Sequence, residues 1–261
     1  MLRTRLAVAA VGLPLLALLV ASPEPVFAAL VTILLGAAAY ELIVSVAPDA
    51  PRPIPLSAAA AAALLAVWMR QLGDAFPLWA LLALPAIALS GLLRPGPGPR
   101  RLPEAWWLGS VVYVGVLGAH WVLLRGEADG RSWLLVLLAV TFATDTGAYA
   151  VGRLVGSHRM APRISPGKTW EGAAGGYVAG AAAAVAMLLT LDIEPGAAGL
   201  ALIAATLPVA AQAGDLIESA LKRRIGVKDS SGLLPGHGGL LDRMDSLLLA
   251  GPSLYWIVQL L

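Results

Sequence analysis

Long apolar runs fill the chain, and short breaks rich in proline, glycine or charge separate them. A run of roughly 20 apolar residues can cross a bilayer as a helix, so each run is interpreted as a membrane span. The predicted spans cover residues 6–21, 26–46, 54–69, 75–93, 106–124, 132–154, 170–190, 197 to the polar stretch that begins at 212, and 239–261. The pattern therefore predicts an all-α polytopic membrane protein with about nine transmembrane helices.

Composition agrees with this interpretation and narrows the chemistry. Hydrophobic residues make up 59% and charged residues 13%, with a mean hydropathy of +0.80, whereas about a quarter of a soluble domain is charged. The absence of cysteine excludes disulfides and thiolate metal sites. With only three His, carboxylates become the expected metal ligands, which favours a hard cation such as Mg²⁺. A net charge of +2 is too small to indicate nucleic-acid binding.

The polar breaks between the spans suggest how the chain is divided into two parts and how it is oriented in the membrane. Residues 1–131 form an N-terminal part of about five spans in which no functional residue is identified, and residues 132–261 form the expected catalytic half of about four spans. The run at 6–21 is interpreted as a first transmembrane helix rather than as a signal peptide. With a cytoplasmic N-terminus, most of the 18 Lys and Arg residues fall on the cytosolic side, as the positive-inside rule requires.

Three glycines in the predicted seventh span, Gly172, Gly176 and Gly180, recur every four residues. Small residues at this spacing let two helices approach closely in a membrane. We therefore interpret them as a helix-packing face rather than as part of a ligand site.

Ionisable residues gather in one stretch, residues 212–246, between apolar runs. Helical spacing places the members of each of two sets on one helix face. The sets are Asp215, Glu218, Ser219 and Lys222 on the eighth predicted helix, and Asp242, Asp245 and Ser246 on the ninth. Polar groups on two apolar helices therefore mark a candidate site.

A further acid, Asp145, lies inside the sixth predicted helix. Leaving the four carboxylates of Asp145, Asp215, Asp242 and Asp245 unpaired would cost on the order of 10 kcal/mol, at about 2.5–3.5 kcal/mol each in mid-bilayer. Divalent cations would remove this cost, and carboxylates at helix ends suit Mg²⁺. Neutralisation by Lys222, Arg223 and Arg243 in a structural salt-bridge network is the alternative, and spacing alone leaves both open.

The segment between the two acidic faces, residues 228–239, is rich in glycine and also holds Lys228 and His237. Glycines allow a backbone to fold around an anion with successive N–H groups directed at it. A flexible connector is the alternative. Beside the carboxylates, a phosphate-binding segment is what phosphoryl or nucleotidyl transfer needs, because a metal neutralises phosphate oxygens and orients the attack.

Together these residues resemble the signature of the CTP:phosphatidate cytidylyltransferases, membrane enzymes that make CDP-diacylglycerol. The matching runs are SALKRRIGVKDSSGLLPGHGGLLDRMD at 219–245, DTGAY at 145–149, ISPGKTWEG at 164–172 and GDLIES at 214–219. The resemblance is strong from about residue 140 to 250 and only general in the first five spans. One position departs from the family, because residue 167 is Gly where a second Lys usually follows Ser-Pro.

The resemblance implies a nucleotidyltransferase of phospholipid biosynthesis that converts CTP and phosphatidate into CDP-diacylglycerol and pyrophosphate with Mg²⁺, and with K⁺ as a candidate second ion. It implies Asp215 and Asp242 as metal ligands, with Asp145 and Asp245 nearby. The expected catalytic residues are Asp215, Asp242, Lys222, Arg243 and His237. The expected substrate-binding residues are Ser165, Lys168, Thr169, Glu171, Glu218, Ser219, Arg223, Lys228, Asp229, Gly238 and Gly239.

The resemblance further implies a multi-pass protein of the inner or plasma membrane, with a cytosol-facing active site and a homodimeric assembly. Three other functions stay open. A CTP-dependent enzyme could use an ether or polyprenyl lipid as acceptor, and a cation-coupled transporter would also need buried acids on its helices. A structural scaffold would tolerate apolar residues in place of the acids.

Overall fold

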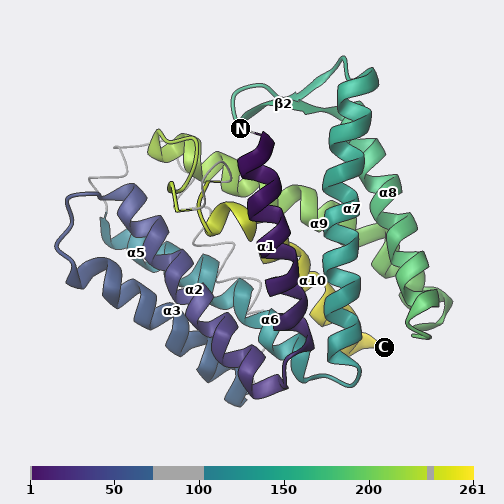
Figure 1. Cartoon of the computed structure of the whole chain (residues 1–261), viewed down its shortest axis with the longest axis horizontal. Coiled ribbons are helices and arrows are strands. Elements are labelled where there is room, and N and C mark those ends of the chain that lie inside the picture. Colours follow the sequence, from purple (N-terminus) through teal and green to yellow (C-terminus); the bar gives the residue numbers. More distant parts are fainter. Residues whose placement is uncertain (1, 73–102, 234–237) are drawn as a thin grey trace. The chain divides into compact units, whose positions relative to one another are not determined.

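The structure is a computed structural model that describes residues 2–72, 103–233 and 238–261 (Figure 1). The predicted span at 75–93 and His237 lie outside the described residues. The chain divides into two compact units, which are described separately. The first unit comprises Met1–Gly126 and Leu221–Met244, and the second comprises Glu127–Ala220 and Asp245–Leu261. Residues 221–244 of the signature thus cluster with the N-terminal helices, and the prediction of a catalytic C-terminal half stays a prediction.

The first unit is a set of apolar helices (Figure 1). Its elements are α1 (Leu2–Ala21), α2 (Glu24–Val46), α3 (Pro53–Leu72), α5 (Pro103–Ser110), the π-helical segment η3 (Val111–Val116), α6 (Leu117–Gly126) and the 3-10 turn η4 (Leu241–Arg243). Alanines at 58, 62 and 66 form one buried stripe of α3. A Cβ at Gly115 would lie 3.1 Å from the Ala62 Cα, so η3 and α3 pack with their backbones close together.

The second unit contains the longest helices. Its elements are α7 (Gly130–Val155), β1 (Arg159–Ala161), β2 (Ser165–Thr169), α8 (Trp170–Thr190), α9 (Gly196–Ile225), whose last turns belong to the first unit, and α10 (Asp245–Leu260). A Cβ at Gly176 would lie 2.7 Å from the Thr144 carbonyl oxygen of α7. Gly172, Gly176 and Gly180 are all buried, which confirms the prediction of a helix-packing face.

The break between the predicted spans 132–154 and 170–190, for which no regular structure was predicted, contains a hairpin between α7 and α8. β1 and β2 pair antiparallel, with Arg159 opposite Thr169 and Ala161 opposite Ser165. Thr169 then ends the strand and caps α8, because its hydroxyl accepts a hydrogen bond of 3.1 Å from the Gly172 N–H. The hairpin therefore leads directly into the helix that follows it.

The membrane class is confirmed, and the number of nine spans is not. Six described helices are long and apolar enough to cross a bilayer: Glu24–Val46, Pro53–Leu72, Glu104–Gly126, Gly130–Val155, Trp170–Thr190 and Gly196–Ile225. The last predicted span starts later than expected. Gly238 has a left-handed φ of 79° and Asp242 lies in η4, so α10 begins at Asp245 and has 16 residues.

Candidate functional site

The predicted site residues that the structure describes fall into one group in each unit. The second-unit group comprises Asp145, Ser165, Lys168, Thr169, Glu171, Asp215, Glu218, Ser219 and Asp245. The first-unit group comprises Lys222, Arg223, Lys228, Asp229, Gly238, Gly239, Asp242 and Arg243. The two groups are described one after the other.

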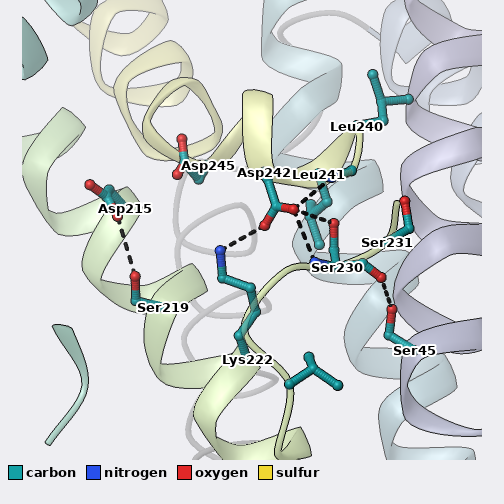
Figure 2. Close-up of polar contacts among 12 residues, drawn as sticks. Ser45, Asp215, Ser219, Lys222, Ser230, Ser231, Leu240, Leu241, Asp242 and Asp245 are labelled. Carbon is teal, nitrogen blue, oxygen red and sulfur yellow. Dashed lines mark hydrogen bonds and ion pairs between the residues drawn. The ribbon is translucent and has the colours of Figure 1, made fainter. Parts of the chain in front are cut away.

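In the second unit, Lys168 and Asp215 form an ion pair. The Lys168 Nζ lies 2.6 Å from Asp215 Oδ2, and both side chains are about a quarter exposed, at 24% and 30%. The Ser219 hydroxyl, one turn along α9, donates to Asp215 Oδ1 at 3.3 Å (Figure 2). The hairpin strand β2 and the helix α9 thus bring a predicted phosphate-binding lysine onto a predicted metal ligand.

Asp245 belongs to the same group because α9 and α10 touch at Gly214. A Cβ at Gly214 would lie 2.5 Å from the Asp245 carbonyl oxygen, so no side chain fits between the two backbones. Asp215 follows Gly214 on α9, and Asp245 opens α10, where its carboxylate accepts a 2.6 Å hydrogen bond from the Ser246 N–H. Two carboxylates from neighbouring helices therefore lie at this crossing.

Two predicted substrate-binding residues of the second unit hold the protein's own backbone. The Glu171 carboxylate accepts from the Ser157 N–H at 3.1 Å and the Ser157 hydroxyl at 2.8 Å, and it contacts the His158 Nδ1 at 2.5 Å. Thr169 uses its hydroxyl as the cap of α8. Both residues fix the hairpin to α8 in the described structure. Of the rest of this group, Asp145 is exposed, Ser165 opens β2, and Glu218 is fully buried.

In the first unit, Asp242 is the centre of a polar cluster. Its Oδ1 lies 2.6 Å from the Lys222 Nζ, and the two side chains are 5% and 14% exposed (Figure 2). Its Oδ2 accepts from the Ser230 N–H and hydroxyl, each at 3.0 Å, and from the Gly239 N–H at 2.7 Å. Asp242 thereby ties together Ser230 and Gly239, the two ends of the glycine-rich segment.

Glu41 of α2 is a site residue that the sequence interpretation missed. It is 7% exposed, and its carboxylate accepts from the Leu240 N–H at 3.2 Å, the Leu241 N–H at 2.8 Å and the Ser231 hydroxyl. The available signal was a single acid inside the apolar run 26–46, because an ionisable residue within a membrane span is a candidate functional residue by default. The same rule had been applied only to the acids of the C-terminal half.

The other members of the first-unit group lie at the surface of the described structure. Arg223, Lys228, Asp229 and Arg243 are exposed, and the Arg223 guanidinium donates to the Val227 carbonyl at 3.1 Å. Arg223, Lys228 and Arg243 are cationic, so this group adds three exposed positive charges to the first unit. Exposed bases of this kind can rearrange around an anionic ligand at little cost.

The carboxylates are held by the protein's own donors. Lys222 neutralises Asp242, as the salt-bridge alternative supposed, and Lys168 neutralises Asp215. Among residues 2–72, 103–233 and 238–261, no group of three or more His, Asp or Glu side chains is placed to hold a metal ion. Oxygen donors of this kind suit Mg²⁺, and a cation would have to replace an ammonium at either carboxylate. The metal role stays a prediction.

Comparison with known proteins identifies the family. The chain is similar to the phosphatidate cytidylyltransferase of Brucella suis biovar 1 (strain 1330), with 44% identity over 153 residues, 58% of this chain and 56% of that protein. It is also similar to the phosphatidate cytidylyltransferase of Staphylococcus haemolyticus (strain JCSC1435), with 42% identity over 153 residues, 59% of this chain and 58% of that protein. The alignments thus span little more than half the length of these relatives. Because the model of the cytidylyltransferase family matches residues 3–261, the chain belongs to the cytidylyltransferase family.

Proposed function

We propose that this protein transfers the cytidylyl group of CTP to the phosphate of phosphatidate, giving CDP-diacylglycerol and pyrophosphate. The observation that carries the proposal is the presence of two lysine–aspartate pairs, Lys168–Asp215 and Lys222–Asp242, in a chain of the cytidylyltransferase family. Each pair joins an ammonium to a carboxylate: Lys168 lies on β2 and binds Asp215 of α9, and Lys222 lies on α9 and binds Asp242 in η4. A polyphosphate bound with its cation needs both kinds of charge.

The carboxylates fit a hard divalent cation by their chemistry. Asp215 and Asp242 would serve as ligands of Mg²⁺, Asp145 and Asp245 would be further candidate ligands, and K⁺ is the candidate second ion. A bound divalent cation neutralises phosphate oxygens and orients an in-line displacement. With such a cation bound, Lys168 and Lys222 would be available to neutralise phosphate oxygens. Each carboxylate and each ammonium would then keep a partner of opposite charge, so no unpaired charge would be left in the protein's apolar interior.

The chain's own bases do the remaining work on the substrates. Lys168, Lys222, Arg223, Lys228, His237 and Arg243 neutralise the phosphates of CTP and the leaving pyrophosphate. A phosphate oxygen of phosphatidate attacks the α-phosphorus of CTP, and the bond from that phosphorus to the bridging oxygen of the β-phosphate breaks with its electron pair on pyrophosphate. A phosphomonoester has its second pKa near 6, so this nucleophile is already largely ionised at pH 7 and needs no protein base.

We also propose that the protein lies in the inner or plasma membrane with this site on the cytosolic side, where CTP is found. The excess of Lys and Arg in the predicted cytosolic segments supports this orientation. A homodimer is proposed from the family resemblance. Chemical cross-linking of the protein in native membranes tests it, and a single cross-linked band at twice the 26.8 kDa chain mass is expected.

The direct test of the activity uses purified protein in lipid nanodiscs with CTP labelled in the cytidine. With phosphatidate and Mg²⁺, a labelled lipid product is expected together with one pyrophosphate per product, and chelation of the metal abolishes both. Parallel reactions with ether phosphatidate and with polyprenyl phosphate measure the acceptor preference. No labelled lipid under any metal condition would overturn the proposal.

Variants separate the metal ligands from the scaffold. Asp215→Asn and Asp242→Asn each remove one proposed ligand, and activity is expected to fall by about 100-fold or more in both, as for loss of a group that acts on transition-state charge. Circular dichroism and membrane insertion report on folding. Normal turnover by either folded variant would show that the replaced residue is not a metal ligand. For the wild-type protein, ion flux without CTP consumption would favour the transporter alternative.

A further inference from the structure

Glu41 lies near the C-terminal end of α2, a mostly apolar helix, and its donors come from 190 to 200 residues further along the chain. A carboxylate that is 7% exposed is strongly disfavoured unless polar donors surround it. Here the backbone N–H groups of Leu240 and Leu241 and the hydroxyl of Ser231 supply them. Packing of α2 alone gives no reason for an acid at this position.

A second residue of α2 holds the other end of the same segment. Ser45 lies one turn beyond Glu41 on the same helix face, and its hydroxyl donates to the Ser230 carbonyl (Figure 2). Glu41 contacts Ser231 and Leu240–Leu241, and Asp242 joins Ser230 to Gly239. The end of α2 therefore fixes residues 230–231, near the start of the glycine-rich segment, and residues 240–241, directly after it.

The contacts of Glu41 bear directly on two residues of the proposed site. The two N–H groups that donate to Glu41 lie at the start of the 3-10 turn Leu241–Arg243. The first N–H groups of such a turn have no acceptor within the turn itself. Glu41 thus caps the turn that carries Asp242 and Arg243. It also accounts for the glycine at 239, because a Cβ there would collide with Glu41 Oε1 and with the Ser230 hydroxyl.

We propose that Glu41 is a positioning residue for the nucleotide site: from α2 it fixes the glycine-rich segment and the turn that carries Asp242 and Arg243. This inference rests on the proposed function. A carboxylate fits better than an amide because two of its partners are backbone N–H groups, which can only donate, and they bind different oxygens of Glu41. In Glu41→Gln the amide nitrogen turns one of these contacts into a clash between two donors.

Hydrogen exchange tests the contact without reference to activity. In the full-length protein in nanodiscs, peptides that contain Leu240 and Leu241 are expected to exchange about tenfold faster in Glu41→Gln than in wild type, because the amide leaves at least one of these two backbone donors without an acceptor. Glu24→Gln is the matched control. It makes the same change on the same helix, at a carboxylate that is 27% exposed and bound to Arg70, and exchange at 240–241 stays at the wild-type rate.

Steady-state kinetics separates positioning from a loss of folded protein. Glu41→Gln is expected to raise the KM for CTP by about tenfold and to lower kcat, since its effect reaches the substrate through Asp242 and Arg243. A merely structural role would reduce the amount of active protein and leave KM unchanged. Unchanged exchange at 240–241, or faster exchange with a wild-type KM, would overturn the proposal.

Two further arms keep the test decisive. If Glu41→Gln does not fold, Ser231→Ala removes a single donor, and it is expected to give the same direction of change in exchange and KM with about two- to threefold amplitude. Wild-type behaviour of a folded Ser231→Ala would then overturn the proposal. If wild-type protein consumes no CTP, the proposed function fails and the role at the nucleotide site fails with it, whereas the exchange result still decides whether Glu41 holds the segment.

Discussion

At the scale of single residues, the buried Lys222–Asp242 pair is the contact whose energetics the structure defines best. Both side chains are largely shielded from water, so each depends on the other for neutralisation. Removing only Lys222 leaves a buried anion, and Lys222→Met is therefore expected to lower the free energy of unfolding by about 3–5 kcal/mol. Thermal or denaturant unfolding in detergent measures this change.

A double-mutant cycle isolates the pair from the other donors of Asp242. Lys222→Met with Asp242→Asn removes both charges, so the double variant is expected to be more stable than the sum of the single changes predicts, by about 1–3 kcal/mol. Asp242→Asn still disturbs the contacts to Ser230 and Gly239. Additive single effects would show that the ion pair contributes nothing to the fold.

Gly167, the position that departs from the family, offers the opposite case of a residue with no steric role. A Cβ there would meet nothing within 4 Å, and the residue is exposed on β2, next to Lys168. Gly167→Lys is expected to change stability by no more than about 0.5 kcal/mol. It adds a cation beside a proposed phosphate-binding lysine, so the KM for CTP is expected to fall, and to fall less at high salt.

Gly167→Ala is the control, since it removes the glycine without adding charge. It should leave the KM for CTP at the wild-type value. An equal change in the alanine and lysine variants would mean that the backbone, and not the charge, sets the effect.

At the scale of elements, the contact between α7 and α8 depends on glycine for close approach. A Cβ at Gly176 would lie 2.7 Å from a backbone oxygen of α7, so a side chain forces the two helices apart. Gly176→Ala is expected to cost about 1–3 kcal/mol of stability, measured by thermal unfolding. Gly12→Ala in α1, where a Cβ meets nothing within 4 Å, is expected to be neutral or stabilising.

The elements also show what the sequence could and could not predict. The bounds of α8 and the continuation of α9 past Pro208 were predicted correctly, because apolar length decides both. The hairpin at 159–169 was missed, since its Pro, Gly and basic residues have weak strand preference and only pairing stabilises them. The late start of α10 was missed because Asp242 binds local backbone donors instead of extending a helix.

The same limit applies to the candidate site. The local motifs around Asp215 and Asp242 were visible as short runs of sequence, and in the structure each of the two carboxylates lies among polar partners. Glu41 could not be connected to Leu241 in this way, because 200 residues separate the two and one sequence carries no record of such a contact. Spacing identifies neighbours on one helix, whereas contacts between distant helices depend on the packed fold.

At the scale of the whole molecule, the orientation in the membrane is the main property still to be measured, and the lack of cysteine makes it accessible. Ala128 lies in the turn between α6 and α7, on the side predicted to face outward, and Gly232 lies in the glycine-rich segment, predicted to face the cytosol. Both positions are exposed, and a Cβ at Gly232 meets nothing within 4 Å. A single cysteine at either place therefore leaves the fold intact.

A membrane-impermeant thiol reagent then reports the side on which each cysteine lies. In intact spheroplasts, Ala128→Cys is expected to be labelled and Gly232→Cys to be protected, with both labelled after permeabilisation, because most of the Lys and Arg residues, including Lys222, Arg223 and Lys228 before Gly232, fall in the segments predicted to be cytosolic. The cysteine-free wild type gives the background. The reversed pattern would place the glycine-rich segment outside, away from cytosolic CTP, and would therefore contradict both the orientation and the proposed use of this nucleotide.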